Sequence, residues 1–442
     1  MSKTLLIFTT LLFSATDDFS STGNLPSNPE LYDIDNLFQN NMLDKAAEEA
    51  SSLSESFGHL PYERLSMLYL KSGILDSSAY YATKTMAIVH SLDDFEGITD
   101  IDKVLEKFSK KVKSAKKSQE RNITEEAIRE YNEILNIFPD FSVALYELGN
   151  IYYLDKDFER AIDFTYRASK INPLNENYEI QVRNISKNFY KDAETQRKQK
   201  RYSEALENYS KAVEYYPEFS TAWFQMARVL YVQKEYERSI SSLKKCTQYN
   251  SEHYQAYKLL GDIYYRMRDN DKASDAYSSA ISINSNYYQA FYSRGNLFLS
   301  DGNYERSIQD YLDCINLKDD YTKAYVALGI AYMNISDYEK SESNLNSALY
   351  YDSNSHEAYF RLSQLFSKKG DFDMARFHAK NALDKKSNYP DAIYELALAE
   401  IELCNKVAAK DNLNKLKTDR RYRSNATNYL KNFAYFTKHC KK

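Results

Sequence analysis

The side chains that most often carry catalytic or metal chemistry are scattered in this sequence. Its histidines show neither an HExxH pattern nor another paired metal-binding spacing. No two cysteines form a CxxC pair, and neither a GxSxG pattern nor a glycine-rich phosphate loop occurs. The residues in question are His59, His90, His253, His356, His378 and His439, with Cys246, Cys314, Cys404 and Cys440. The sequence therefore predicts no catalytic residue, no metal site and no cofactor, and indicates a protein that is not an enzyme.

A lysine-rich segment is the strongest local concentration of charge. It contains Lys103, Lys107, Lys110, Lys111, Lys113, Lys116 and Lys117. Such a run can bind nucleic acid or an anionic membrane. These lysines occupy more than one face of a helix, and no interleaved aromatic residues follow for base stacking. We therefore expect a solvated helix, and no nucleic-acid partner.

The composition favours a folded, elongated helical protein. The 442 residues include 58 basic and 63 acidic side chains, which gives a formal net charge of −5. An apolar fraction of 43% argues against a disordered chain. Only 10 glycines and 7 prolines occur, too few for a loop-rich β-sandwich, whereas tyrosine occurs 41 times. Tyrosine suits half-buried positions, which are common in long, thin architectures.

The N-terminus resembles a signal peptide. Lys3 precedes an apolar run from Leu5 to Phe13, and the small residues Ser14 and Ala15 follow it. We expect a signal peptide over residues 1–15 and export to the periplasm, the secretory lumen or the medium. The alternative is an ordinary N-terminal helix or strand in a cytoplasmic protein. The run is too short to span a bilayer, and no later segment resembles a membrane span.

A 34-residue repeat dominates the rest of the sequence. Large apolar residues recur at this spacing at Trp223, Tyr257, Phe291, Tyr325, Tyr359 and Ile393. A small residue stands four positions after each of them: Ala227, Gly261, Gly295, Gly329, Ser363 and Ala397. Further small positions follow after 12 and then 7 more residues, and they include Cys246 and Cys314. We therefore expect these two cysteines to be buried thiols; Cys404 and Cys440 would be able to pair in an exported protein.

Each repeat predicts two antiparallel helices. Apolar residues recur at helical spacing within each half, and small residues let two helix backbones approach closely. Turn-forming residues lie between the halves, for example at 155–157, 269–271 and 301–302. Pro139, Pro173 and Pro217 are expected to end the second helix of their repeats. Serine replaces alanine at several small positions, which we expect to weaken individual repeats.

This pattern resembles the tetratricopeptide repeat family. The family signature of W-x2-L-G-x2-Y, A-x3-F, A and P is nearly complete in one repeat. Its matching residues are Leu145, Leu148, Gly149, Tyr152, Phe158, Ala161, Ala168 and Pro173. The resemblance covers residues 108–423 in about nine units. It implies an all-α fold, a right-handed α-solenoid of stacked helix–turn–helix repeats.

The remaining segments are assigned around this array. Residues 27–90 resemble two degenerate N-terminal repeats, and residues 91–107 are expected to form a linker. A ten-residue insertion at 176–185 keeps helical spacing, so we expect one long continuous helix. Residues 424–442 carry an apolar stripe (Tyr429, Leu430, Phe433 and Phe436) and are expected to form a capping helix.

The resemblance implies that repeat positions 2, 5, 9, 12 and 13 face a concave groove. The candidate groove residues are Tyr146, Asn150, Tyr190, Arg197, Phe224, Arg228, Tyr231, Lys258, Tyr265, Arg266, Tyr292, Asn296, Lys323 and Phe360. Over 186–355 the groove positions carry seven basic and two acidic residues, a local balance of 7 − 2 = +5. The lysine–asparagine clamp that some family members use for C-terminal carboxylates is not formed. We predict a protein or peptide partner with acidic and apolar side chains.

The function predicted from these features is a non-catalytic scaffold or adaptor that binds partner segments in the groove. A secretory-pathway or periplasmic co-chaperone or assembly factor, or a regulatory subunit of an enzyme complex, is the alternative. An enzyme hidden in residues 16–107 is disfavoured because that segment is short and repeat-like. The oligomeric state stays open.

Overall fold

The computed structural model describes residues 101–121, 123–137, 139, 141–171 and 176–441. It also describes residues 33–57 except 35, 39 and 41, together with Tyr62, Leu65, Leu68, Tyr69 and Tyr81. The expected signal peptide at 1–15 and residues 91–100 of the expected linker lie outside the described residues. All regular structure in the described part of the chain is helical, as the sequence predicts.

The chain divides into two units. The first comprises residues 1–199 and 210–217, and the second comprises residues 200–209 and 218–442. The helices of the first unit are α3 (Leu43–Phe57), α6 (Ile101–Glu120), α7 (Thr124–Ile137), α8 (Ser142–Leu154), α9 (Phe158–Ile171) and α10 (Glu176–Lys198). Helix α11 (Tyr202–Tyr215) has residues in both units.

One difference from the predicted boundaries lies in the first unit. Helix α6 begins at Ile101, so residues 101–107 are helical and do not form a linker. The apolar spacing of Ile101, Val104, Leu105 and Phe108 explains this, since it continues the pattern of the helix that follows. In the segment of the expected N-terminal repeats, Ala46, Tyr62, Leu65 and Tyr69 share one buried cluster.

The insertion at 176–185 is helical throughout, as predicted. Helix α10 runs over 23 residues without interruption. Its buried residues Tyr178, Val182, Ile185, Phe189 and Ala193 are those that the spacing selects. One apolar stripe therefore continues through the insertion.

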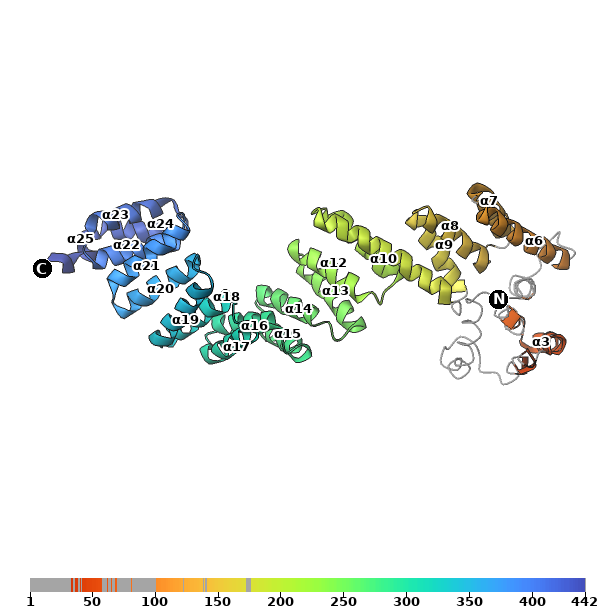
Figure 1. Ribbon diagram of the computed structural model, residues 1–442, viewed down its shortest axis with the longest axis horizontal. Helices are drawn as coiled ribbons and strands as arrows, with labels where there is room; N and C mark the ends of the chain where they lie inside the picture. The colour runs from red at the N-terminus through yellow and green to blue at the C-terminus, as the bar shows by residue number, and fades with distance from the viewer. Residues whose placement is uncertain are drawn as a thin grey trace. The chain divides into compact units, whose positions relative to one another are not determined.

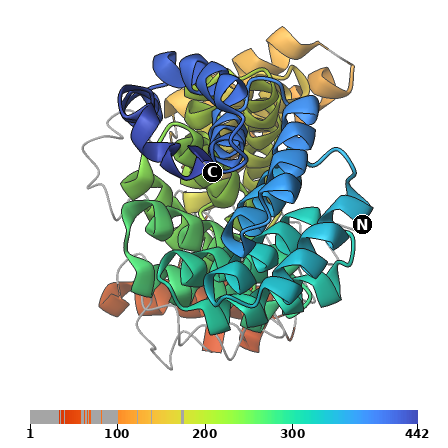
Figure 2. The same cartoon turned by 90° about the vertical axis from the view of Figure 1, so that its left-hand side faces the viewer.

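Six helix pairs and a C-terminal cap form the second unit (Figure 1). The pairs are α12 (Ser220–Val232) with α13 (Tyr236–Tyr249), α14 (Tyr254–Met267) with α15 (Asn270–Ile283), α16 (Tyr288–Ser300) with α17 (Tyr304–Leu317), α18 (Thr322–Asn334) with α19 (Tyr338–Tyr351), α20 (His356–Lys369) with α21 (Phe372–Lys385), and α22 (Pro390–Glu402) with α23 (Lys406–Lys415). Seen from its C-terminal end, this unit winds from green through teal to blue around a common axis (Figure 2).

The turn inside each pair depends on one residue in the left-handed backbone region. Positive φ angles occur at Lys156, Lys200, Lys234, Arg268, Gly302, Ser336, Gly370 and Cys404; the steps are 34 residues from Lys200 onward and 44 between Lys156 and Lys200, where the ten-residue insertion lies. This conformation reverses the chain within a few residues and fixes the antiparallel pairing. Only two of the eight are glycines, so the turn tolerates the strain of a side chain at most repeats.

Small residues let the paired helices touch. A Cβ atom added at Gly329 would lie 2.7 Å from Leu345, and one at Gly261 would lie 2.5 Å from the Tyr277 ring. Two of the serines in the second helices form hydrogen bonds to the first helix of their pair. Ser239 and Ser341 donate hydrogen bonds to the carbonyl oxygens of Ala227 and Gly329, at 2.7 and 2.8 Å. These bonds satisfy buried hydroxyls, so serine does not simply weaken these repeats.

The C-terminal end is covered by several short helices, not by one. They are η2 (Leu416–Thr418), α24 (Arg423–Lys431), α25 (Phe433–Phe436) and η3 (Lys438–Lys441). The predicted stripe of Tyr429, Leu430, Phe433 and Phe436 packs against α22 and α23 as expected. A disulfide joins Cys404 to Cys440 and ties this cap to the α22–α23 turn.

Cys246 and Cys314 are buried free thiols, and burial raises the pKa of each to about 12.

Candidate protein-binding groove

The first helices of successive pairs in the second unit contact one another in order, from α12 to α22. Their repeat positions 2, 5, 9, 12 and 13 form what we call the first-helix face. Ten of the fourteen predicted groove residues belong to these helices: Phe224, Arg228, Tyr231, Lys258, Tyr265, Arg266, Tyr292, Asn296, Lys323 and Phe360. The other four belong to helices α8 and α10 of the first unit.

In the first unit, the four predicted residues have partners within the protein. Tyr146 packs on Tyr178 with ring centroids 4.6 Å apart, and burial raises the pKa of its hydroxyl. Asn150 hydrogen-bonds the Tyr146 side chain. Arg197 forms an ion pair with Glu194 at 2.7 Å, and Tyr190 is half-buried beside them on α10.

The basic residues of the second unit are less available than the sequence suggests. Lys258 forms an ion pair with Asp262 at 2.7 Å, and the Tyr277 hydroxyl donates to the other carboxylate oxygen at 2.9 Å. Arg266 donates to the Tyr231 hydroxyl. The two acidic groove residues pair directly with Lys258 and Arg197, so the predicted surplus of +5 is carried by the other five basic groove residues.

Arg228 and Lys323 remain exposed on this face. Arg228 donates to Gln225 at 2.9 Å and lies 5.9 Å from the Phe224 ring centroid. Among the described residues, no carboxylate lies within 4.0 Å of either cation. These two side chains are thus the basic groups that α12 and α18 offer to a partner.

The aromatic candidates divide into surface and core. Tyr265 is exposed, whereas Phe224 and Tyr292 are half-buried; Phe224 packs on His253 and Tyr292 on Tyr321. Asn296 accepts a hydrogen bond from the Tyr311 hydroxyl at 2.8 Å. Phe360 is only 5% exposed, so it is a core residue and not a groove contact.

Phe360 owes its burial to a neighbouring ring. The Tyr389 ring lies edge-on to it, with centroids 5.3 Å apart. Tyr389 also donates to Glu357, which holds its ring in this position.

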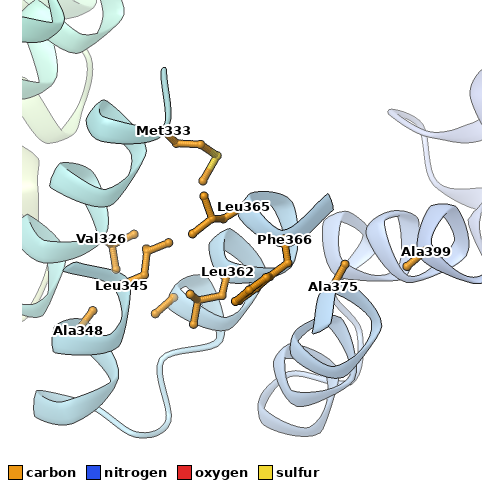
Figure 3. Close-up of a cluster of buried hydrophobic side chains, with 10 residues drawn as sticks. Val326, Met333, Leu345, Ala348, Leu362, Leu365, Phe366, Ala375 and Ala399 are labelled. Carbon is orange, nitrogen blue, oxygen red and sulfur yellow. The ribbon is translucent and has the colours of Figure 1, made fainter. Parts of the chain in front are cut away.

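A pocket of about 400 Å³ opens on the first-helix face where α18, α20 and α22 meet. Most of its lining comes from positions 9, 12 and 13 of these helices. The lining residues are Ile330, Met333, Asn334, Arg361, Gln364, Ser367, Lys368, Glu395 and Leu398. Met333 also belongs to the buried cluster beneath, where it is directed toward Leu365 (Figure 3). The core therefore holds one wall of the pocket in place.

One carboxylate of the pocket is weakly satisfied. Glu395 is half-buried and accepts only long contacts, from Gln364 at 3.4 Å and from Ser367 at 3.5 Å. Burial raises its pKa, and Arg361 and Lys368 oppose this only in part. Arg361 is committed elsewhere, since it donates to Glu357 at 2.8 Å and to Gln364 at 2.9 Å.

Sequence reasoning selected none of the pocket residues as principal site residues. Asn334, Gln364 and Lys368 do occupy groove positions, but the two charged residues Arg361 and Glu395 stand at repeat position 6. Both extend from the edge of their helices into the pocket. A search for charged residues at position 6 would have found them.

The described residues contain one group of donors suited to a metal. Cys404, His439 and Cys440 have ligand atoms within 4.8 Å of one another. The two sulfur atoms are joined as a disulfide, so they are not thiolate ligands in this state.

Within the described part of the chain, no helix has the length and apolar character needed to cross a bilayer.

Comparison with known proteins identifies the repeats. One tetratricopeptide repeat model matches residues 190–252 and 258–314, and a second matches 322–355 and 356–386. A comparison with curated proteins finds no match for the sequence.

The solved structures that match this chain share little sequence with it. The C-terminal part of a repeat-containing protein from Cytophaga hutchinsonii is 17% identical (54% of this chain, 98% of that chain, TM-score 0.46). PilW, described as a type IV pilus biogenesis factor, is 18% identical (48% and 98%, TM-score 0.44). YrrB, described as having an unusual peptide-binding site, is 18% identical (42% and 95%, TM-score 0.37).

The family matches coincide with the 34-residue helix pairs from α10 to α21, and the same pairing continues through α22 and α23. Residues 190–386 of the chain therefore carry tetratricopeptide repeats.

Proposed function

We propose that this protein is a non-catalytic scaffold that holds an extended or helical segment of a partner protein on the first-helix face of its second unit. Repeats of this family generally serve protein interaction. The single observation that carries the proposal is the pocket across α18, α20 and α22. It is lined by side chains of three successive repeats at the positions expected to face a partner.

The partner segment is proposed to be acidic and apolar along α12 to α18. Arg228 and Lys323 are exposed there, and the exposed Tyr265 on α14 offers aromatic area. Arginine and tyrosine are enriched at protein interfaces because they combine large contact area with directed hydrogen bonds.

Site-specific photo-cross-linking tests which face binds. Peptide ligands are first selected from a random displayed library against the full chain. A photoreactive benzoylphenylalanine then replaces Lys368 on the first-helix face or, as a control, Lys244 on α13. Cross-linking of the selected peptide at 368 and not at 244 is expected. The reverse pattern would move the binding surface to the second helices.

Charge reversal tests the basic part of the face. The double variant Arg228→Glu with Lys323→Glu should weaken an acidic peptide at least tenfold, measured by fluorescence anisotropy. The matched control reverses Lys244 and Lys406, which are exposed on second helices. Equal affinities for the two double variants would contradict acidic recognition.

We also propose that the protein works in an oxidising compartment after export. The pairing of Cys404 with Cys440 supports this, since disulfides persist mainly outside the cytosol. Alkylation and mass spectrometry of protein from its native source test the proposal. Cys404 and Cys440 should resist alkylation until reduced, and the mature N-terminus should follow residue 15. Free thiols at both positions together with an intact N-terminus would refute it.

A further inference from the structure

The chemistry of the pocket points to a more specific occupant. We propose that it takes one basic side chain of the partner segment, a lysine or an arginine, whose charged end pairs with Glu395. This inference rests on the proposed function, because it needs a partner segment on the first-helix face.

Glu395 lacks a partner strong enough for a carboxylate in its position. Its contacts at 3.4 and 3.5 Å come from a neutral amide and a neutral hydroxyl. No cation of the described residues lies within 4.0 Å of it. A carboxylate removed from water is stabilised by an ion pair with good geometry, which a ligand ammonium or guanidinium would supply.

The walls of the pocket suit the stem of such a side chain. Ile330, Met333 and Leu398 supply apolar surface around the carboxylate. Lysine and arginine carry long methylene stems that pack on apolar surface while the head group makes polar contacts. A volume of about 400 Å³ lies in the range of ligand sites and has room for one long side chain.

An acidic occupant fits less well. Lys368 and Arg361 also line the pocket, and they are the groups that an acid would use. Arg361 already pairs with Glu357 at 2.8 Å, which leaves Lys368 as the available cation. An incoming carboxylate would therefore meet one free cation and, beside it, the carboxylate of Glu395.

The neighbouring groove positions also become less basic toward the C-terminus. Helices α20 and α22 carry Glu357, Asp391 and Glu402 at these positions, against Lys368 alone. Glu357 is paired with Arg361 and Asp391 with Arg421, so Glu402 is the acid left at these positions. Helices α12 and α18 instead present the exposed Arg228 and Lys323. A partner with acidic residues at one end and a basic anchor at the other would match this gradient. The gradient would fix the direction in which the segment lies.

Selection from a random displayed peptide library on the full chain tests the inference. Peptides that cross-link at position 368 should share a lysine or arginine at one position. Replacing that lysine by norleucine, or that arginine by citrulline, should weaken binding about tenfold or more. This comparison changes only the ligand, so it does not depend on the folding of a variant.

A protein variant provides the second arm. Glu395→Gln should lose the same factor of about ten toward the basic peptide and bind the norleucine peptide like wild type. Glu305→Gln is the matched control, because it makes the same change at an exposed position on α17. Peptides that cross-link at 368 without a shared basic residue, or that bind Glu395→Gln unchanged, overturn the basic anchor and leave the proposed function standing. Peptides that never cross-link at 368 refute the proposed function itself.

Discussion

Two buried carboxylates in the second unit show how similar groups take different roles. Asp310 on α17 is 3% exposed, and Glu395 on α22 is half-buried in the pocket; burial raises the pKa of both. Asp310 receives two hydrogen bonds from Arg294, at 2.8 and 3.0 Å, and Arg294 also donates to Ser278 at 2.9 Å. Glu395 has only its two long contacts with neutral donors.

The difference that decides their roles lies in the partners. Asp310 is satisfied within the protein and holds α16 to α17. Glu395 keeps its capacity for a strong ion pair and faces a pocket. Burial with a raised pKa is therefore not enough to mark a binding residue; the missing partner is the informative observation.

Removing Asp310 should give the largest effect. Asp310→Ala leaves the Arg294 guanidinium half-buried without its counter-charge, and breaking such a pair costs about 3–5 kcal/mol. Urea unfolding followed by circular dichroism measures the loss. The conservative Asp310→Asn variant should lose less, because it keeps an acceptor for Arg294. If the free energy of unfolding of the alanine variant falls by less than about 1 kcal/mol, Asp310 does not have this structural role.

The pH dependence of peptide binding should be the next largest effect. Protonation of Glu395 removes the charge that holds a basic anchor, so affinity should fall about tenfold on acidification. Because its pKa is raised, the fall should begin at a higher pH than for an ordinary glutamate, whose pKa is about 4.3.

Other titratable groups face Glu395, and the control must account for them. Arg361 and Lys368 face it from α20, Tyr394 lies on its own helix and Tyr422 precedes α24. Burial raises the pKa of both tyrosines to about 12, well above the range in which the affinity should fall. Anisotropy titrations with a histidine-free peptide should show the fall in wild type and a flat profile in Glu395→Gln. The same profile in both would assign the titration to another group.

Glu395→Gln should slightly stabilise the free protein. A glutamate with a raised pKa in the folded state stabilises the fold below its unfolded pKa, and this contribution is lost as the pH rises through the folded pKa. At pH 7 the ionised carboxylate therefore destabilises the folded state, and its replacement by the amide should increase the free energy of unfolding by about 0.5–1 kcal/mol. Thermal unfolding at pH 7 and pH 4 measures this, and the gain should shrink at the lower pH. A loss of stability at pH 7 would mean that Glu395 is satisfied like Asp310.

Lys258→Met should have the smallest effect. The Lys258–Asp262 pair spans four residues of one helix, and such pairs contribute about 0.3–0.5 kcal/mol. Asp262 keeps the hydrogen bond from Tyr277 in the variant. Thermal unfolding should shift by no more than a degree or two, and peptide affinity should stay close to that of wild type. A large loss of affinity would show that Lys258 contacts the partner despite its internal ion pair.

Much of the fold could be predicted from local patterns. The 34-residue spacing of aromatic and small residues gave the helix pairs, and the buried thiols at Cys246 and Cys314 followed from the same register. Helices α7, α9 and α11 end two residues before their prolines, as predicted. The C-terminal cap was less predictable, because one apolar stripe is compatible with a single helix or with several short ones.

The candidate site was harder to predict, because position in a repeat does not reveal partners. Lys258 stands at a groove position and is neutralised by Asp262, whereas Phe360 stands at one and is covered by Tyr389. Glu395 stands outside the groove positions and still lines the pocket.

The sequence by itself determined the repeat, its helices and its turns, since these depend on residues at most a few tens of positions apart. The tertiary structure alone decided that Asp310 pairs with Arg294 of the neighbouring helix, where three repeats leave a pocket and that Cys404 meets Cys440. Those outcomes depend on the distances between side chains of different helices, and a spacing along the chain does not fix such distances.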